Sequence, residues 1–334
     1  MPDLADARWF AADLHVPDRR FGMLHLDEEL VERSSFLDTR LEVPLASAQP
    51  VAVASVAAAT LPSAPVGWLF HTSFCASTLL ARALHVPGFA VALKEPLVLR
   101  RLSDARKSRW PLEGLVEPTV KLLARSWHPD AAIVIKPTHV ALNIAGDLLA
   151  ATPDRRAMIL TSSLDDFLIS NLKKPPESQA KIVLLVERAL RATRFGERLP
   201  ALANRPPDML GAAGLQWAAQ REHVLDLALA IGGERLRVMD ARQLLDDLAD
   251  TVWKAAQWLQ LPAPRDALIA HATAVAARNA KALDVGYGPA KRAREAVEVA
   301  HHYRHELARA RSWLAAHVLP AMRAAALADP PRWQ

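Results

Sequence analysis

The segment from Val66 to Leu84 constrains the fold more than any other part of the chain. Val66–Phe70 is an apolar run with the length of a buried strand, and apolar residues then recur at helical spacing at positions 79, 80, 83 and 84. The loop between them, His71–Thr78, ends in Ser-Thr. A strand, a tight loop and a helix N-terminus direct backbone N–H groups and the positive end of the helix dipole toward one point. The segment therefore predicts an α/β fold with an anion-binding loop.

This loop departs from the Walker A pattern G-x-x-x-x-G-K-[ST]. When the pattern is ended on Thr78, His71 and Ala76 occupy the glycine positions and Ser77 the lysine position. The loop therefore lacks the charge that ATPases place on the terminal phosphates. Backbone N–H groups and hydroxyls remain, which suits a 5′-phosphate or phosphosulfate better than a magnesium-bound triphosphate. An ordinary strand-to-helix turn with a Ser or Thr N-cap would give the same pattern.

Composition narrows the class of protein. The 334 residues are 51% hydrophobic and 23% charged, which is typical of globular proteins, and the formal net charge of +5 is spread along the chain. We see no basic stripe with interleaved aromatic residues, so we expect no nucleic acid partner. Cys75 is the single cysteine, and it is expected to be a buried small hydrophobe in a protein of the reducing cytoplasm. No cysteine and histidine spacing suggests a metal.

Two segments need separate interpretation. Residues 51–70 are uncharged and about as long as a membrane span, but Pro62 and Pro65 interrupt them. We interpret them as a connection followed by a strand, and expect no membrane span. The first twenty residues carry four aspartates and no apolar core, which argues against a secretory signal.

Strands and helices alternate along the chain. Strands are predicted at residues 66–70, 89–93, 131–135, 157–160 and 235–239, with amphipathic or apolar helices between them. This alternation predicts a three-layer α/β/α fold with a mainly parallel sheet. Residues 1–63 are expected to form a helical or irregular accessory segment packed on the core domain, 64–292. Residues 293–334 should form a C-terminal helical segment, with one long helix over 301–326.

Polar residues follow several of these strands. Lys94 and Glu95 follow the second, Lys136 and His139 the third, and Thr161-Ser162-Ser163 the fourth. Ligands of parallel sheets bind at the carboxyl ends of the strands. If the sheet is parallel, these side chains converge with the loop His71–Thr78 on one edge.

This order of motifs resembles the P-loop sulfotransferases, which use 3′-phosphoadenosine-5′-phosphosulfate (PAPS), in particular their diverged bacterial members. The resemblance covers roughly residues 64–292. Ala76-Ser77-Thr78 is similar to the end of the family's phosphosulfate loop, although Phe74 stands where the family has a basic residue. Lys136 and His139 are similar to a strand-end lysine and histidine, with one extra residue between them.

The resemblance also implies a 3′-phosphate site and a basic closing loop. Ser170 matches a helix serine of the family, whereas Ser162 stands where the family has an arginine. Lys291 and Arg292 end a Gly-Tyr-Gly-Pro stretch where the family has its basic loop. The nucleotide site implied in this way comprises His71, Thr72, Ser73, Phe74, Cys75, Ala76, Ser77, Thr78, Ser162, Ser170, Lys291 and Arg292.

The resemblance implies sulfuryl transfer from PAPS to a hydroxyl or amine of a small molecule, without a metal. Lys136 is the first candidate for the cation on the transferring group, and Lys94 is the second. His139 or Glu95 would be the general base. Each lysine could also be a strand-end residue without a role in chemistry.

Two other classes of function stay open. One is a nucleotide-dependent small-molecule kinase, which the absent Walker lysine disfavours. The other is a non-catalytic binding or partner protein that kept the fold, which Phe74 and Ser162 at basic positions favour. The acceptor and the oligomeric state are not predicted.

Overall fold

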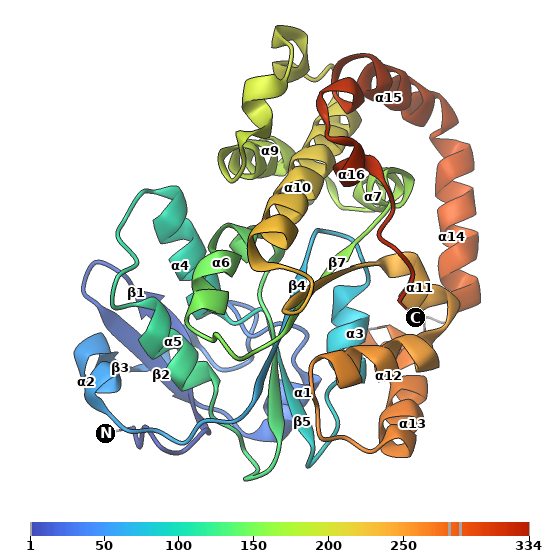
Figure 1. Cartoon of the computed structure of the whole chain (residues 1–334). Coiled ribbons are helices and arrows are strands. Elements are labelled where there is room, and N and C mark those ends of the chain that lie inside the picture. The colour runs from blue at the N-terminus through green and yellow to red at the C-terminus, as the bar shows by residue number, and fades with distance from the viewer. Residues whose placement is uncertain (1, 280–281, 287–288, 334) are drawn as a thin grey trace.

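A five-stranded parallel sheet forms the centre of the molecule in the computed structural model, which describes residues 2–279, 282–286 and 289–333 (Figure 1). The strand order is β5-β6-β4-β7-β8. The bounds are β4 (Val66–His71), β5 (Ala90–Lys94), β6 (Ala132–Lys136), β7 (Ala157–Thr161) and β8 (Leu236–Asp240). Each of the five predicted strands is thus found within a residue or two, and the predicted α/β fold with a parallel sheet is confirmed.

Helices cover both faces of this sheet. On one face, alternate strand residues such as Leu69 and Val134 pack against α3 (Ser77–Ala83), α12 (Leu248–Trp258) and α13 (Arg265–Ala276). Residues of the other face share a core with α4, α5 and α6 and with the N-terminal segment. The bounds of these three helices are Leu97–Lys107, Val116–Leu123 and Ala145–Ala150. Burial on both faces explains why the strands are continuous apolar runs.

The N-terminal segment contains a small antiparallel sheet, so the expectation of a helical or irregular lobe was wrong. Its strands, in order, are β1 (Trp9–His15), β2 (Arg20–His25) and β3 (Gln49–Ala52), and its helices are α1 (Glu28–Arg33) and α2 (Val53–Ala58). The register of β1 shifts between Ala11 and Asp13, and this irregularity places three buried residues in succession. A shift of this kind hides the alternation by which a strand is recognised.

A second group of helices lies above the carboxyl ends of the strands (Figure 1). It includes α7 (Leu164–Leu172), α9 (Ile182–Arg191), α10 (Met209–Ile231) and α15 (Arg304–His317). The remaining elements are η1 (Leu45–Ser47), η2 (His139–Ile144), α8 (Pro176–Gln179), η3 (Arg194–Arg198), η4 (Ala201–Asn204), α11 (Ala241–Asp246), β9 (Arg278–Asn279), β10 (Ala282–Gly286), α14 (Pro289–His302), η5 (Leu319–Ala321) and α16 (Ala324–Leu327).

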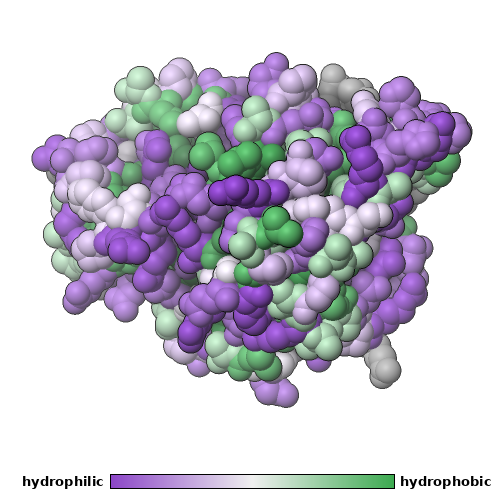
Figure 2. All heavy atoms as spheres, turned by 90° about the horizontal axis from the view of Figure 1, so that it is seen from above, coloured by the Kyte–Doolittle hydropathy of each residue, from purple (hydrophilic) through white to green (hydrophobic). Residues whose placement is uncertain are grey.

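The C-terminal segment differs from the single long helix that was expected over 301–326. Tyr303 separates α14 from α15, and α15 ends before Val318. Pro320 follows in η5, and proline cannot continue a helix without losing a backbone hydrogen bond. Within the described residues, no helix is both long and apolar enough to cross a membrane. Seen from above, the surface is mostly hydrophilic, with hydrophobic residues in small groups (Figure 2).

Candidate active site

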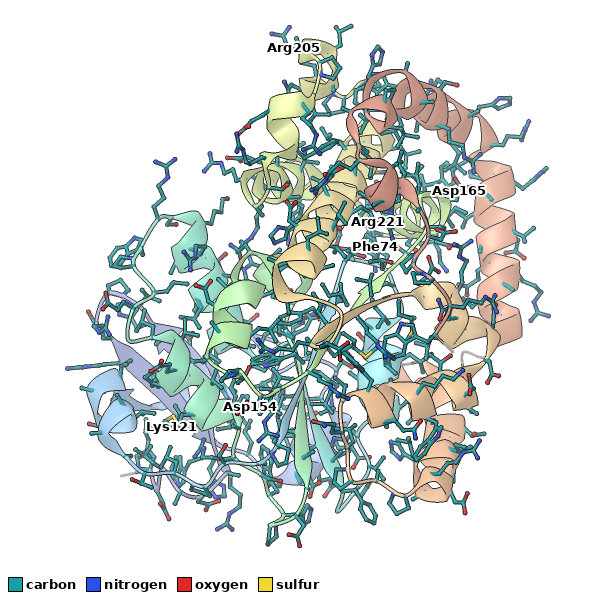
Figure 3. The ribbon with its side chains drawn as sticks, in the orientation of Figure 1. Phe74, Lys121, Asp154, Asp165, Arg205 and Arg221 are labelled. Carbon is teal, nitrogen blue, oxygen red and sulfur yellow. The ribbon has the colours of Figure 1, made fainter. Side chains whose placement is uncertain are left out.

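The candidate site lies at the upper edge of the sheet in the view of Figure 3. Asp154, which precedes β7, lies at the lower end of the strands, and Phe74, which follows β4, lies at the upper end. The strands therefore run upward in this view. β4 lies between β6 and β7, so the chain leaves it toward one side of the sheet and later returns to the other. Such a reversal of strand order is where open α/β sheets bind ligands.

The loop after β4 is a tight turn with buried hydroxyl groups. Phe74 and Ala76 have φ angles of 60° and 55°, a left-handed conformation that residues other than glycine rarely adopt. Cys75 Sγ donates a hydrogen bond to the carbonyl oxygen of Thr72 at 3.2 Å, and burial raises the pKa of its thiol to about 11. Cys75 is thus a neutral structural thiol. Ser73 Oγ is buried and has no hydrogen-bond partner among the described residues. A ligand oxygen is one group that could pair with it.

Phe74, at the position where a basic residue was expected from the resemblance, packs against Phe167 of α7. Their ring centroids lie 5.2 Å apart, with the rings edge to face. Lys174 Nζ lies 5.2 Å from the centroid of the Phe74 ring, and burial lowers the pKa of this lysine. A cation from the segment after α7 therefore lies beside the loop, although the loop itself carries none.

Lys136 and Glu95 form a buried ion pair at the ends of β6 and β5. Lys136 Nζ donates to Glu95 Oε1 at 2.6 Å, and the lysine side chain is 0% exposed. Burial is the largest single influence on Glu95 and raises its pKa, but the charge and hydrogen bond of Lys136 and the two nearby histidines together lower it by more, so the pKa falls to about 2 and the carboxylate stays ionised. Within the described part of the chain, Glu95 is the hydrogen-bond acceptor of Lys136 Nζ. The other N–H groups of this ammonium are left to donate to an anion.

His71 and His139 lie next to this pair. Their ring centroids are 6.2 Å apart, and His71 Nε2 is 3.8 Å from Glu95 Oε1. Burial lowers the pKa of both imidazoles, that of His139 to about 4, so both are neutral at pH 7. The Nε2 atoms of both rings are buried and have no hydrogen-bond partner among the described residues. A neutral imidazole with a free nitrogen is able to accept a proton.

Lys94, the second cation candidate, points elsewhere. Its Nζ donates to the carbonyl oxygens of Val31 at 2.8 Å and Glu32 at 3.1 Å, near the end of α1. Burial lowers the pKa of Lys94 to about 7. Although Lys94 pairs in register with Lys136 in the sheet, its ammonium group anchors α1 and is not bonded to Glu95. The structure does not bring it to the cluster formed by Lys136, Glu95, His71 and His139.

The residues of the expected 3′-phosphate site lie on neighbouring elements. Ser162 follows β7, and its Oγ is buried with no partner among the described residues, whereas Ser170 is half-buried on α7. Lys291 and Arg292 belong to the first turn of α14 rather than to a loop. This helix lies against α7, where Lys173 forms an ion pair of 2.8 Å with Glu295. Tyr287 and Gly288 of the expected loop lie outside the described residues.

Sequence reasoning missed a set of polar side chains on α9 and α10. Gln216, Gln220 and His223 lie at i, i+4 and i+7 on α10, which is otherwise largely apolar, and line a pocket together with His139 and Arg188. Each contributes a buried polar atom that has no partner among the described residues. Since an unsatisfied buried polar group costs about 1–3 kcal/mol, such a cluster calls for an explanation. Its helical spacing was the signal available in the sequence.

The comparisons with known proteins concern structure rather than sequence. No protein-family profile and no curated protein matches the chain. It resembles the solved structure of a sulfotransferase from Alicyclobacillus acidocaldarius, with 16% identity over 61% of this chain and 83% of that one, at a TM-score of 0.39. A sulfotransferase from Mycobacterium avium is similar at 15% identity over 75% and 78% of the two chains, with a TM-score of 0.41. The sulfotransferase domain of the curacin biosynthetic pathway is similar at 13% identity over 69% and 86%, with a TM-score of 0.37.

Proposed function

We propose that the protein transfers a sulfuryl group from PAPS to a hydroxyl group of a small molecule. The observation that carries the proposal is the buried Lys136 ammonium, held by Glu95 and next to two neutral histidines, at the strand edge that also bears the loop His71–Thr78. Transfer of a charged group between two oxygens requires a fixed cation, a proton acceptor and a site with little water. These three requirements meet at this edge.

The proposed reaction is a direct displacement at sulfur. The acceptor oxygen forms a bond to sulfur, the bond between sulfur and the bridging phosphate oxygen breaks, and adenosine 3′,5′-bisphosphate leaves with that electron pair. The acceptor hydroxyl loses its proton to a base. Lys136 would stabilise the negative charge that builds up on the bridging oxygen and the sulfuryl oxygens. Backbone N–H groups and the hydroxyls of the loop would hold the 5′-phosphate.

The geometry favours His139 over Glu95 as the base. Glu95 accepts a hydrogen bond from Lys136 and has a depressed pKa, so its carboxylate has little tendency to take a proton. His139 is neutral, its Nε2 is unpartnered among the described residues, and it lines the pocket between η2, α9 and α10. In this assignment, Glu95 orients Lys136 and stabilises the imidazolium that forms on His139.

The test is turnover of PAPS by Lys136→Met, with Lys121→Met as the matched control. Lys121 is also bonded to oxygen atoms, the carbonyls of Ala57 and Ala59, but it lies on α5 at the lower left of Figure 3, away from Phe74. Because Lys136 would contact the transferring group, we expect its loss to lower kcat by about 100-fold or more, while the control keeps its rate. Equal rates for both variants would remove Lys136 from the mechanism.

A nucleotide panel tests the donor separately. Adenosine 3′,5′-bisphosphate and PAPS should stabilise the protein against heat without magnesium, since no metal takes part in the proposed chemistry. Stabilisation by ATP that depends on magnesium would favour a kinase instead. If no nucleotide in the panel binds at millimolar concentration, the fold serves a non-catalytic role and the proposal fails.

A further inference from the structure

A second cavity, between α1, α3, β5 and α13, is lined by charged residues that the proposed function does not use. Its volume is about 280 Å³, close to the lower end of the range for ligand sites, which is about 300 Å³. Lys94 and His85 line it as fully buried side chains, whereas Glu29 is exposed and Glu32 is half-buried. The cavity therefore has an inner end and an outer end with different chemistry.

His85 contributes an unused hydrogen-bond donor. Its Nδ1 accepts from the backbone N–H of Ala92 at 3.2 Å, and burial lowers its pKa to about 3, so the neutral ring carries its proton on Nε2. This Nε2 is buried and has no hydrogen-bond partner among the described residues, since Glu28 Oε1, at 3.9 Å, is too far away. Buried N–H groups are normally paired, so this one calls for an acceptor from a ligand or from water.

Lys94 adds a buried positive charge at the same end. Its ammonium group donates to the carbonyl oxygens of Val31 and Glu32, and in the described part of the chain it forms no ion pair with a carboxylate. An ammonium has three N–H groups, so one is left for a ligand. Arg82 donates to the same carbonyl oxygen of Glu32 at 2.8 Å, which brings a second positive charge close by. Because buried charges are normally paired, the inner end favours an anionic group.

The outer end has the opposite charge. Glu29 and Glu32 lie at i and i+3 on α1, so they share one face of this helix, and both line the cavity. Neither carboxylate forms an ion pair with another residue that the structure describes. Arg33 also lines the cavity, but its charge is balanced by Glu42, at 2.7 Å. The outer end therefore favours a cationic group.

The charges on the two ends balance. Two positive charges, on Lys94 and Arg82, face two negative ones, on Glu29 and Glu32, so the best ligand has no net charge but separated charges of both signs. We infer that this cavity binds a small amino acid as a zwitterion, with its carboxylate on His85 and Lys94 and its ammonium group toward Glu29 and Glu32. A carboxylate has two oxygen atoms, one for each inner donor. Binding at this cavity requires neither PAPS nor the cluster around Lys136.

The experiment compares four probes with the same four-carbon skeleton: butyrate, butylamine, 2-aminobutyrate and 4-aminobutyrate. The two amino acids hold their charges at two different separations. Their affinities for the full chain are measured without nucleotide by ligand-observed NMR. We expect butyrate to bind about fivefold or more tighter than butylamine, and at least one amino acid to bind about threefold or more tighter than butyrate. Equal affinities of butyrate and butylamine, amino acids that bind no better than butyrate, or no binding of any probe would overturn the inference.

Variants test the two ends separately. Lys94→Met should weaken butyrate binding about tenfold or more, because the inner charge is lost. Lys121→Met is the matched control, since Lys121 also donates to carbonyl oxygens at the end of a helix, α2. Replacing both Glu29 and Glu32 by glutamine should abolish the preference for the amino acid over butyrate, whereas Glu117→Gln, at an exposed position of α5, should keep it. A preference that survives the double substitution would contradict the assignment of the outer end.

The pH dependence of binding tests the inner end even if Lys94→Met does not fold. Burial lowers the pKa of Lys94 to about 7, so its charged form is a minority above pH 7 and butyrate affinity should fall about tenfold from pH 8 to pH 9. The charged or titratable groups near Lys94 or in the same cavity are Glu29, Glu32, Arg33, Arg82, His85, Lys136 and His271. An affinity that stays constant over this range, or that falls equally in Lys94→Met, would show that Lys94 does not hold the carboxylate.

Discussion

Replacing Glu95 by glutamine tests the electrostatic core of the candidate site. The substitution keeps the shape of the side chain but removes the counter-charge of Lys136, which is 0% exposed. At 2.6 Å and an effective dielectric constant of about 20, the attraction lost is about 6 kcal/mol. Breaking a buried ion pair by removing one partner is typically found to cost about 3–5 kcal/mol, because an uncompensated charge stays behind.

The destabilisation caused by Glu95→Gln should therefore be about 3–5 kcal/mol, because the ammonium of Lys136 stays buried without a counter-charge.

The assay is urea unfolding followed by tryptophan fluorescence, and the matched control is Glu187→Gln. Glu187 is likewise in an ion pair of 2.6 Å, with Arg191, but its side chain is 44% exposed, so its loss should change the free energy of unfolding by less than about 0.5 kcal/mol. The reasoning is refuted if Glu95→Gln and Glu187→Gln lower the free energy of unfolding by equal amounts.

Two further predictions concern pH and the loop. Burial lowers the folded-state pKa of four histidines below the unfolded value of about 6.5, so the unfolded chain binds more protons than the folded one. The free energy of unfolding should therefore fall as the pH drops below 6.5, by up to about 1.4 kcal/mol per pH unit for each histidine. Urea unfolding at pH 7, 6 and 5 should show this slope, and a free energy of unfolding that does not change with pH would contradict it. These histidines are His71, His85, His139 and His223. Ala76→Gly should stabilise the protein by up to about 1 kcal/mol, because Ala76 has a φ of 55°, which glycine adopts without strain. Ala81→Gly, inside α3, should destabilise the protein by at least as much, because glycine disfavours a helix interior. If thermal unfolding shows that both substitutions change the stability in the same direction, this account of the loop is excluded.

The sequence predicted the sheet well because each of its strands is buried on both faces. A run such as Ala131–Ile135 is apolar at every position and is followed by a charged residue, so its ends are visible without any tertiary information. The N-terminal strands mix buried, half-buried and exposed residues, and in β1 the register shift interrupts their alternation. Their identity depends on pairing with β2, which no local pattern reveals.

The site divides in the same way. The predicted strand ends were enough to place Lys136, Glu95 and His139, because the carboxyl ends of parallel strands lie at one edge of the sheet. The fate of Lys94 could not be predicted in this way, since the carbonyl oxygens that bind it come from a helix more than sixty residues earlier in the chain. The helical spacing of the polar residues on α10 was visible in the sequence, but that they face inward depends on packing against α9 and η2, which the sequence does not reveal.

These contacts bear on the two basic residues that the resemblance led us to expect at positions 74 and 162. An electrostatic site needs positive charge at a point in space and not at a given position in the sequence. Lys136 reaches the edge from β6, and Lys174 lies 5.2 Å from the ring of Phe74. Replacing Phe74 by a basic residue would therefore remove its packing against Phe167, and it would add a cation to a region that already has two. Loss of the basic residue from the loop does not by itself argue that the edge has lost its affinity for anions.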